Sequence, residues 1–519
     1  MRRTPLLALA GIVVAVAAAL PAAYLVIGIA DEPQAAWDAI WREQTLELAL
    51  RSMGLALAVT VTAVAIALPL AWVTVRTDLP ARRLWATLTA LPLVIPSYIG
   101  AYLFIAALGP KGILQSALEP LGVDRLPSIY GFFGAWLVLS LFTYPLVLIT
   151  VRGALTRLDP QLEDAARGLG RTPAGVFRSV TLPQLYPAIG AGALLVALYV
   201  LSDFGAVSLL RFNSFTREIY LSYNISFDRT AAAALGALLV LLTLGLLYLH
   251  GRARRRQVYY RVGPGTRRTQ RVVRLGAWRW PALAFCALIV AVGLVLPVGV
   301  LVYWATSGLS AGVDAGSLAV NAGHSLLAGA LAAVVGGVCA IVVGLLVVRR
   351  PGRVSTVIER VSFSAYALPG IVIALALVYF GTRAVPALYQ SLAMLVFALS
   401  MHYMPLAIGA TTAALLQISP RTEEAARTLG RGPAGVLRTI TAPLAAGGVI
   451  AGAALVFLHA VKELPATLLL APIGFETLAT DIWRQTGYGF FEAAAVPSLI
   501  LLLVAAPPLY LLSDRGVSS

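Results

Sequence analysis

Long apolar stretches separated by short polar segments run through the whole chain. A helix needs about 20 mostly apolar residues to cross the hydrocarbon core of a bilayer. On that basis the sequence predicts twelve membrane-spanning helices, at roughly residues 5–29, 49–75, 85–108, 131–151, 186–210, 230–250, 280–304, 323–348, 360–381, 391–413, 444–470 and 489–513. We therefore expect an all-α membrane protein.

Two polar segments are near copies of each other, 260 residues apart. Residues 160–183 and 420–443 agree at 15 of 24 positions without a gap. A segment repeated at a fixed spacing indicates duplicated structural units. We expect two homologous halves of six membrane helices each, residues 1–250 and 280–519, joined by a linker at 251–279.

Composition and charge agree with this arrangement. Of the 519 residues, 59% are hydrophobic and 12% are charged, which excludes a soluble globular protein. The net charge of +16 comes from arginines gathered in short loops, for example at Arg76 and Arg349. Such loops mark the cytoplasmic side of a membrane protein, so we expect no nucleic-acid partner. The loops of the other side carry acids such as Asp31, Glu32 and Asp314.

This alternation predicts a multi-pass protein of the inner or cytoplasmic membrane with both termini in the cytoplasm. The linker is its most basic segment, because residues 251–278 contain nine arginines and no acidic residue. We expect it to be flexible and to lie against anionic lipid.

Each copy of the repeated segment predicts two short helices joined by a tight corner. Pro160 and Pro420 suit the first turn of a helix, and Gly170 and Gly430 suit its end in a left-handed conformation. A second proline, three residues after the glycine, starts the next helix. The first helix is too polar to cross a membrane and too short to be stable alone, so it requires a partner surface.

These segments resemble the coupling loop of the permease subunits of binding-protein-dependent ATP-binding-cassette importers. That pattern reads Glu-Ala-Ala, three residues, Gly, nine residues and Ile-x-Leu-Pro. Two positions depart from it, Asp164 in place of glutamate and Ala442 in place of leucine. The resemblance implies that the residues which couple to the ATPase are Glu163, Asp164, Ala165, Ala166, Gly170, Glu423, Glu424, Ala425, Ala426 and Gly430.

The resemblance also implies partners and roles. In that family the alanines let the helix sit close in a groove of the ATPase, the glycine makes the corner, and the acid adds polar contacts. The implied partners are cytoplasmic ATPase subunits, two in number, and a periplasmic or lipid-anchored substrate-binding protein, with membrane lipid around the chain.

The chain itself is not expected to be an enzyme. A phosphate-binding P-loop needs Gly-Lys followed by Ser or Thr, and the two lysines of the sequence, Lys111 and Lys462, follow a proline and a valine. We expect this chain to bind no cofactor, with ATP and magnesium used by the partner subunit. A membrane-embedded enzyme is a rival reading, but we find no nucleophile–base pair, HExxH motif or metal-spaced His/Cys cluster.

Charged residues inside the predicted spans are candidates for the translocation pathway. Asp203 and Glu463 occupy the same place in the two repeats, and Lys462 is beside Glu463. A charge at the bilayer centre costs roughly 2.5–3.5 kcal/mol on insertion scales. The alternative is that they lie near an interface or cap a helix. Pro145 and Pro405 also correspond and are expected to kink equivalent spans.

Three histidines, His324, His402 and His459, lie in or beside spans. No repeated ligand pairing accompanies them, so we predict no resident metal site.

The segments around these charges resemble the ferric-iron importer permeases, at Asp203-Phe-Gly-Ala-Val-Ser-Leu-Leu-Arg-Phe-Asn-Ser-Phe-Thr216 and Lys462-Glu-Leu-Pro-Ala-Thr-Leu-Leu-Leu470. The resemblance covers essentially the whole chain and implies a fused permease that moves ferric iron by alternating access. Thiamine, polyamine, phosphonate and sulfate importers are related and stay open as alternatives. An ion-coupled secondary transporter also uses repeats and midplane charges, but it would not need two coupling loops.

Overall fold

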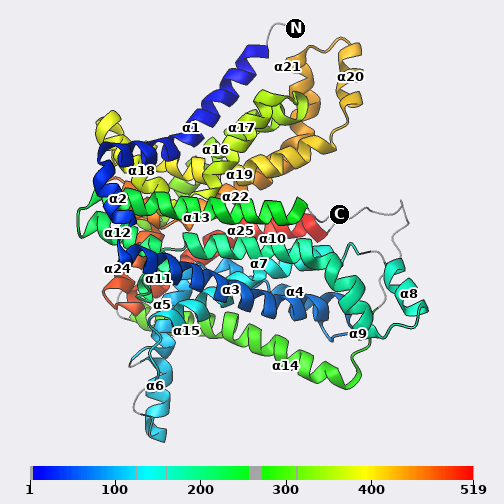
Figure 1. The fold of residues 1–519 in the computed structure, drawn as a ribbon, viewed down its shortest axis with the longest axis vertical. Helices are drawn as coiled ribbons and strands as arrows, with labels where there is room; N and C mark the ends of the chain where they lie inside the picture. The colour runs from blue at the N-terminus through cyan, green and yellow to red at the C-terminus, as the bar shows by residue number, and fades with distance from the viewer. Residues whose placement is uncertain are drawn as a thin grey trace. The chain divides into compact units, whose positions relative to one another are not determined.

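The computed structural model describes residues 4–110, 112–123, 126–158, 160–255, 272–310 and 314–517. Within these ranges every regular element is a helix, apart from a single bridge between Thr77 and Val273. The all-α prediction is therefore confirmed for the described part of the chain (Figure 1).

Ten helical stretches of the described residues are long and apolar enough to cross a membrane, or eleven if a bent pair counts as one span. The multi-pass prediction is confirmed, but the count of twelve is not. The ninth predicted span falls on the bent pair Arg353–Ala367 and Gly370–Ala384, which meet at 106°. The twelfth falls on α25 (Phe491–Val517), a helix that begins with the apolar stretch Phe491–Ala505.

The chain forms two compact units, each assembled from separate segments. Unit 1 comprises Met1–Arg42, Glu218–Val240 and Ala305–Ser519, and unit 2 comprises Glu43–Arg217 and Leu241–Trp304. Three helices contain a boundary between them: α12 (Phe215–Asn224), α13 (Arg229–Arg255) and α15 (Leu296–Ser310).

The other helices of unit 2 are α3 (Glu43–Arg76), α4 (Arg82–Leu88), η1 (Leu91–Val94), α5 (Ser97–Leu108), α6 (Ile113–Leu118), η2 (Glu119–Leu121), α7 (Phe132–Leu155), α8 (Pro160–Gly168), α9 (Pro173–Val176), the π-helix η3 (Phe177–Thr181), α10 (Leu182–Ser202), α11 (Gly205–Leu209), η4 (Gly276–Trp278), α14 (Arg279–Val290) and the π-helix η5 (Ala291–Val295).

The other helices of unit 1 are α1 (Thr4–Asp31), α2 (Pro33–Ile40), α16 (Ala315–Arg349), α17 (Arg353–Ser364), η6 (Ala365–Ala367), α18 (Gly370–Ala384), η7 (Pro386–Leu388), α19 (Leu392–Gln417), α20 (Pro420–Thr428), α21 (Pro433–Val436), the π-helix η8 (Leu437–Thr441), α22 (Ala442–Val461), α23 (Pro465–Leu470), α24 (Leu478–Gly487) and α25.

Each unit is built around three long helices that pack against one another, α3, α7 and α10 in unit 2 and α16, α19 and α22 in unit 1. A glycine allows the closest approach at the same place in both repeats. A Cβ atom on Gly192 would lie 2.7 Å from Cα of Val147, and one on Gly452 would lie 2.8 Å from Cα of Ala407. Small residues permit such close packing between membrane helices. The sequence repeat is therefore also a structural repeat.

One long helix in each unit is broken near a proline. In unit 2 the third predicted span divides into α4, η1 and α5, and Pro96 occupies the N-cap of α5. In unit 1 the ninth divides into α17, η6 and α18, and Pro369 occupies the N-cap of α18. Proline disfavours the helical conformation of the residue before it and is accepted at a helix start, so both spans bend here.

The compact units do not coincide with the predicted halves, because each contains the first helix of the other half. In unit 1, α1 packs against α16, α17 and α18, and Asp31 at its end accepts hydrogen bonds from Tyr379 and Arg383 of α18. In unit 2, η5 packs against α7 and η1. The predicted boundaries at 250 and 280 are defined by the repeat and stay predictions.

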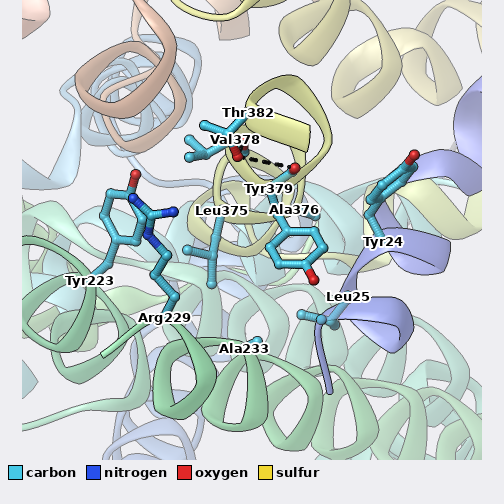
Figure 2. Close-up of a pocket in the computed structure, with 11 residues that line it drawn as sticks. Tyr24, Leu25, Tyr223, Arg229, Ala233, Leu375, Ala376, Val378, Tyr379 and Thr382 are labelled. Atoms are coloured by element: carbon cyan, nitrogen blue, oxygen red, sulfur yellow. Dashed lines mark hydrogen bonds between the residues drawn. The ribbon is translucent and has the colours of Figure 1, made fainter. Parts of the chain in front are cut away.

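The contact between α1 and α18 leaves a small pocket inside unit 1 (Figure 2). Tyr24 comes from α1, Tyr379 from α18, Tyr223 from α12 and Arg229 from the start of α13. Arg229 is the one charged group among its lining residues, and the others are mainly aliphatic or aromatic. We interpret the pocket as a feature of helix packing.

Candidate functional site

The two repeated segments have the predicted shape of helix, corner and helix. In unit 2, α8 lies beyond the end of α7 and is followed by α9, and α20 and α21 form the same arrangement in unit 1 (Figure 1). The corner glycines, Gly170 and Gly430, have φ angles of +80° and +84°. This left-handed conformation suits glycine because it has no Cβ.

Hydrogen bonds at both corners close the helix end in the same way. The backbone N–H of Gly170 donates to the carbonyl of Arg167 at 2.9 Å, and that of Arg171 donates to the carbonyl of Ala166 at 3.1 Å. The corresponding bonds at Gly430 and the residue after it are 3.0 and 3.1 Å long. This pair of bonds is the Schellman motif, which satisfies carbonyl groups left free at a helix end.

The adjacent acids of each loop have opposite surroundings. Glu163 and Glu423 are buried, whereas the side chain of Asp164 is 58% exposed and Glu424 is also exposed. The alanines divide in the same way, since Ala166 and its counterpart Ala426 are buried while Ala165 and Ala425 are exposed. Leu169 and Leu429, just before the corners, are each 84% exposed. One face of each helix is thus held by the permease and the other is free for a partner.

In unit 2 the buried acid joins three elements. Glu163 forms an ion pair with Arg76, the last residue of α3. The hydroxyl of Thr181, the last residue of η3, donates to the same carboxylate oxygen at 3.0 Å. Arg167 approaches the other oxygen at 3.4 Å. We call Arg76, Glu163 and Thr181 the first anchor.

Unit 1 contains the same arrangement. Arg349, the last residue of α16, approaches Oε1 of Glu423 with Nη2 at 2.9 Å and Nε at 3.1 Å. The hydroxyl of Thr441, the last residue of η8, donates to Oε1 at 2.8 Å. We call Arg349, Glu423 and Thr441 the second anchor.

The sequence indicates the anchor arginines only as charges that mark one side of the membrane. Arg76 and Arg349 are 273 residues apart, whereas the loops are 260 apart. The connection between α5 and α7 is longer than that between α18 and α19, so a single offset does not align the arginines with the loops. An alignment that allowed a gap in this connection would have matched them.

The acid of unit 2 that the sequence predicts to lie in the membrane caps a helix break. Asp203, 8% exposed, follows the last residue of α10 and accepts hydrogen bonds at Oδ1 from the backbone N–H groups of Ala206 at 3.0 Å and Val207 at 3.3 Å. Its other oxygen accepts a hydrogen bond from Ser97, the first residue of α5. The carboxylate therefore joins the break after α10 to the break before α5.

The acid of unit 1 has the same place with different neighbours. Glu463 accepts hydrogen bonds from the backbone N–H of Ala466 at 3.0 Å and from the hydroxyl of Tyr403 at 2.8 Å. A Cβ atom on Gly370, the first residue of α18, would lie 2.7 Å from Oε1 of Glu463. A short acid beside serine in one repeat thus corresponds to a longer acid beside glycine in the other.

The remaining pathway candidates lie on α7 and α19 and at the end of α22. Pro145 and Pro405 are buried inside α7 and α19, at equivalent places. Lys462 is partly buried at the end of α22, and none of the ion pairs of the described residues joins it to Glu463. The charge compensation that the sequence suggests for this pair therefore does not take the form of a direct ion pair.

Two of the three candidate histidines lie near Glu463. The ring of Tyr403 is 4.4 Å from that of His402 and 5.3 Å from that of His459, measured between centroids. His324 stacks on Phe475 at 4.1 Å. In the described ranges, no three or more His, Cys, Asp or Glu side chains are grouped so that they could hold a metal ion.

Comparison with known proteins finds the same duplication. The model of the family described as "Binding-protein-dependent transport system inner membrane component" matches twice, at residues 63–258 and 334–517. Each match contains one of the two repeated loops and one of the two acids, Asp203 or Glu463.

Individual relatives are permeases of several importers. The chain is 33% identical over 429 residues to the Fe(3+)-transport system permease protein FbpB 2 of Haemophilus influenzae, covering 81% of this chain and 80% of that protein. It is 34% identical over 137 residues to the molybdenum transport system permease protein ModB of Escherichia coli, covering 26% and 58%. A bacterial ABC transporter involved in alginate import is a weak structural likeness, with a TM-score of 0.33 at 16% identity over 43% of this chain and 84% of that chain.

A duplicated loop of this geometry, two matches to the family and a relative matched over 81% of the chain agree with one another. The chain therefore belongs to the family of binding-protein-dependent transport system inner membrane components, as a fused permease that carries the family's module twice.

Proposed function

We propose that this permease imports ferric iron, which it receives from a substrate-binding protein and releases into the cytoplasm. The observation that supports iron is the 33% identity to an Fe(3+)-transport permease over 81% of the chain. The molybdenum and sulfate permeases are matched over 26% and 34% of it, so the similarity to them is confined to part of the chain.

Energy for transport comes from two separate ATPase subunits, one on each coupling loop. Support comes from the exposed face that α8 and α20 share, with a leucine at its end and an acid in its middle. ATP and magnesium are bound by those subunits. For the loops to reach these subunits, the loops must lie in the cytoplasm. The basic linker and both termini are then cytoplasmic as well, in agreement with the distribution of arginine.

The pathway lies beside the two helix breaks that Asp203 and Glu463 cap. Discontinuous helices in transporters expose backbone groups to the substrate at membrane depth, and non-helical backbone is tolerated there where it lines a cavity. Pro145, Pro405 and Lys462 are included because they lie on the helices that pack around these breaks.

The substrate is tested by reconstituting the permease with its ATPase in lipid vesicles and adding binding protein loaded with one ligand at a time. We expect ATP hydrolysis to rise several-fold with ferric-loaded protein. If ATP hydrolysis rises only with protein loaded with molybdate, sulfate, thiamine, polyamine or phosphonate, the chain is an importer permease but iron is not its substrate. Uptake driven by an ion gradient without ATP would refute the importer.

A further inference from the structure

The two anchors share a geometry that separates the neighbouring acids of each loop into different roles. In both units the buried acid accepts from an arginine that ends one membrane helix and from a threonine that leads into another. We propose that Glu163 and Glu423 are positioning residues that transmit movement of the coupling loop to the membrane helices. The exposed acids that follow them, Asp164 and Glu424, face the ATPase instead.

The burial of the anchors is the first reason. The side chains of Arg76 and Glu163 are 3% and 5% exposed. A buried ion strongly prefers to keep its partner, because losing it leaves an uncompensated charge. The position of α8 is therefore tied to the end of α3, and a displacement of the loop displaces that helix as well.

The elements that the anchors join are the second reason. Through the first anchor, α8 is joined to α3 and to the start of α10, two of the three helices that form the core of unit 2. Through the second, α20 is joined to α16 and to the start of α22 in unit 1. Asp203 directly follows the last residue of α10, and Glu463 follows the last residue of α22 by two positions. One continuous helix thus leads from each anchor to the acid of the same unit, Asp203 or Glu463.

The two anchors differ in ways that predict unequal effects. In the first, the guanidinium of Arg76 also lies 5.6 Å from the ring of Trp72, which packs edge-on against Phe177 of η3 at 4.9 Å. The backbone of Val273, from the linker, pairs with Arg76 as well. In the second, the Arg349 side chain is 20% exposed, so water can hydrate it if its partner is lost.

We therefore place the test at the second anchor, because a substitution there should disturb folding less than one at the first anchor. This inference rests on the proposed function, and the experiment uses the reconstituted complex of permease, ATPase and ferric-loaded binding protein. Glu423→Gln is compared with Glu424→Gln, the same chemical change one residue away. The quantity measured is the iron taken up divided by the ATP hydrolysed.

We expect Glu423→Gln to lower this ratio by about tenfold, in the usual range for coupling between sites. Glu424→Gln should lower uptake and hydrolysis together, with less ATPase co-purifying and a ratio close to wild type. Arg349→Lys, which keeps the cation, should restore most of the coupling that Arg349→Met loses.

Equal ratios for Glu423→Gln and Glu424→Gln would overturn the proposal. So would a loss of co-purifying ATPase that is greater for Glu423→Gln. If Glu423→Gln does not accumulate in the membrane, Thr441→Val, which removes only one hydrogen bond, replaces it and must lower the ratio. A wild-type complex without ATP-dependent uptake would refute the proposed function and not the anchors.

Discussion

Single residues decide the shape of each coupling loop. Among the described residues, apart from the chain neighbours, no heavy atom lies within 4 Å of a Cβ added to Gly170 or Gly430. The requirement for glycine there therefore comes from the backbone and not from crowding. Two residues later the copies differ, with Thr172 in one and Gly432 in the other, at φ angles of −65° and −67° that any residue can adopt. The loop thus contains one position that requires glycine and, two residues later, one whose backbone accepts other residues.

We expect Gly430→Val to disable the loop, because a left-handed conformation costs an L-residue about 1–2 kcal/mol and a β-branched one more. The direction of α20 relative to α21 would then change. Uptake of iron should fall at least fivefold, with less ATPase co-purifying. Gly432→Thr is the matched control, since the first copy carries threonine there, and it should behave as wild type. Normal uptake by Gly430→Val would contradict the role of the corner.

At the scale of helices, the breaks in the spans are held by matched pairs of residues. Two pairs of residues fill equivalent space in the two units, Ser97 with Asp203 and Gly370 with Glu463. In the first pair both side chains are short, and in the second the longer acid faces a residue without a side chain. In each pair, one residue starts a helix after a proline and the other lies just after the end of a helix from elsewhere in the same unit. Neither member can therefore change size independently of the other.

Gly370→Ser alone should destabilise unit 1, because the new Cβ would lie 2.7 Å from the Glu463 carboxylate. Overpacking of this kind costs roughly 1–3 kcal/mol of folding free energy. Adding Glu463→Asp shortens the acid and should recover at least half of the loss. The measurement is the thermal unfolding midpoint of each purified permease, together with Glu463→Asp as the fourth member of the cycle. Additive effects of the two substitutions would show that the pair is not coupled.

At the scale of the whole molecule, the chain carries the family's module twice, and we propose that other subunits supply its energy. The sequence has no Gly-Lys-Ser or Gly-Lys-Thr, so it has no P-loop to hold the phosphates of ATP. The permease family to which it belongs is named for its dependence on a binding protein. The proposed function assigns one ATPase subunit to each of its two loops.

We expect the purified permease alone to hydrolyse no ATP above the rate of an empty vesicle preparation. Hydrolysis should appear only after an ATPase subunit is added. Titration of that subunit should saturate at two per permease, since each loop provides one site. Disabling one loop with Gly430→Val should reduce the saturating number to one. A single ATPase bound to the wild type would show that the loops are not equivalent.

The sequence alone determined the features that depend on local pattern. Runs of apolar residues indicated a multi-pass helical protein, and proline and glycine at fixed spacing indicated the helix, corner and helix of each loop. It also identified Asp203 and Glu463 as a pair, because the repeat aligns them directly. These predictions succeeded because hydrophobic length, capping and left-handed glycine are properties of a few consecutive residues.

Tertiary structure decided what depends on residues far apart in the chain. Only packing shows that Glu163 and Glu423 are buried while their neighbours are exposed, since the partners Arg76 and Arg349 lie 87 and 74 residues away. The same holds for the exchange of first helices between the units and for the bend in the ninth predicted span. Helix periodicity indicates which residues share a face, but the identity of the surface that covers that face is a property of the assembled fold.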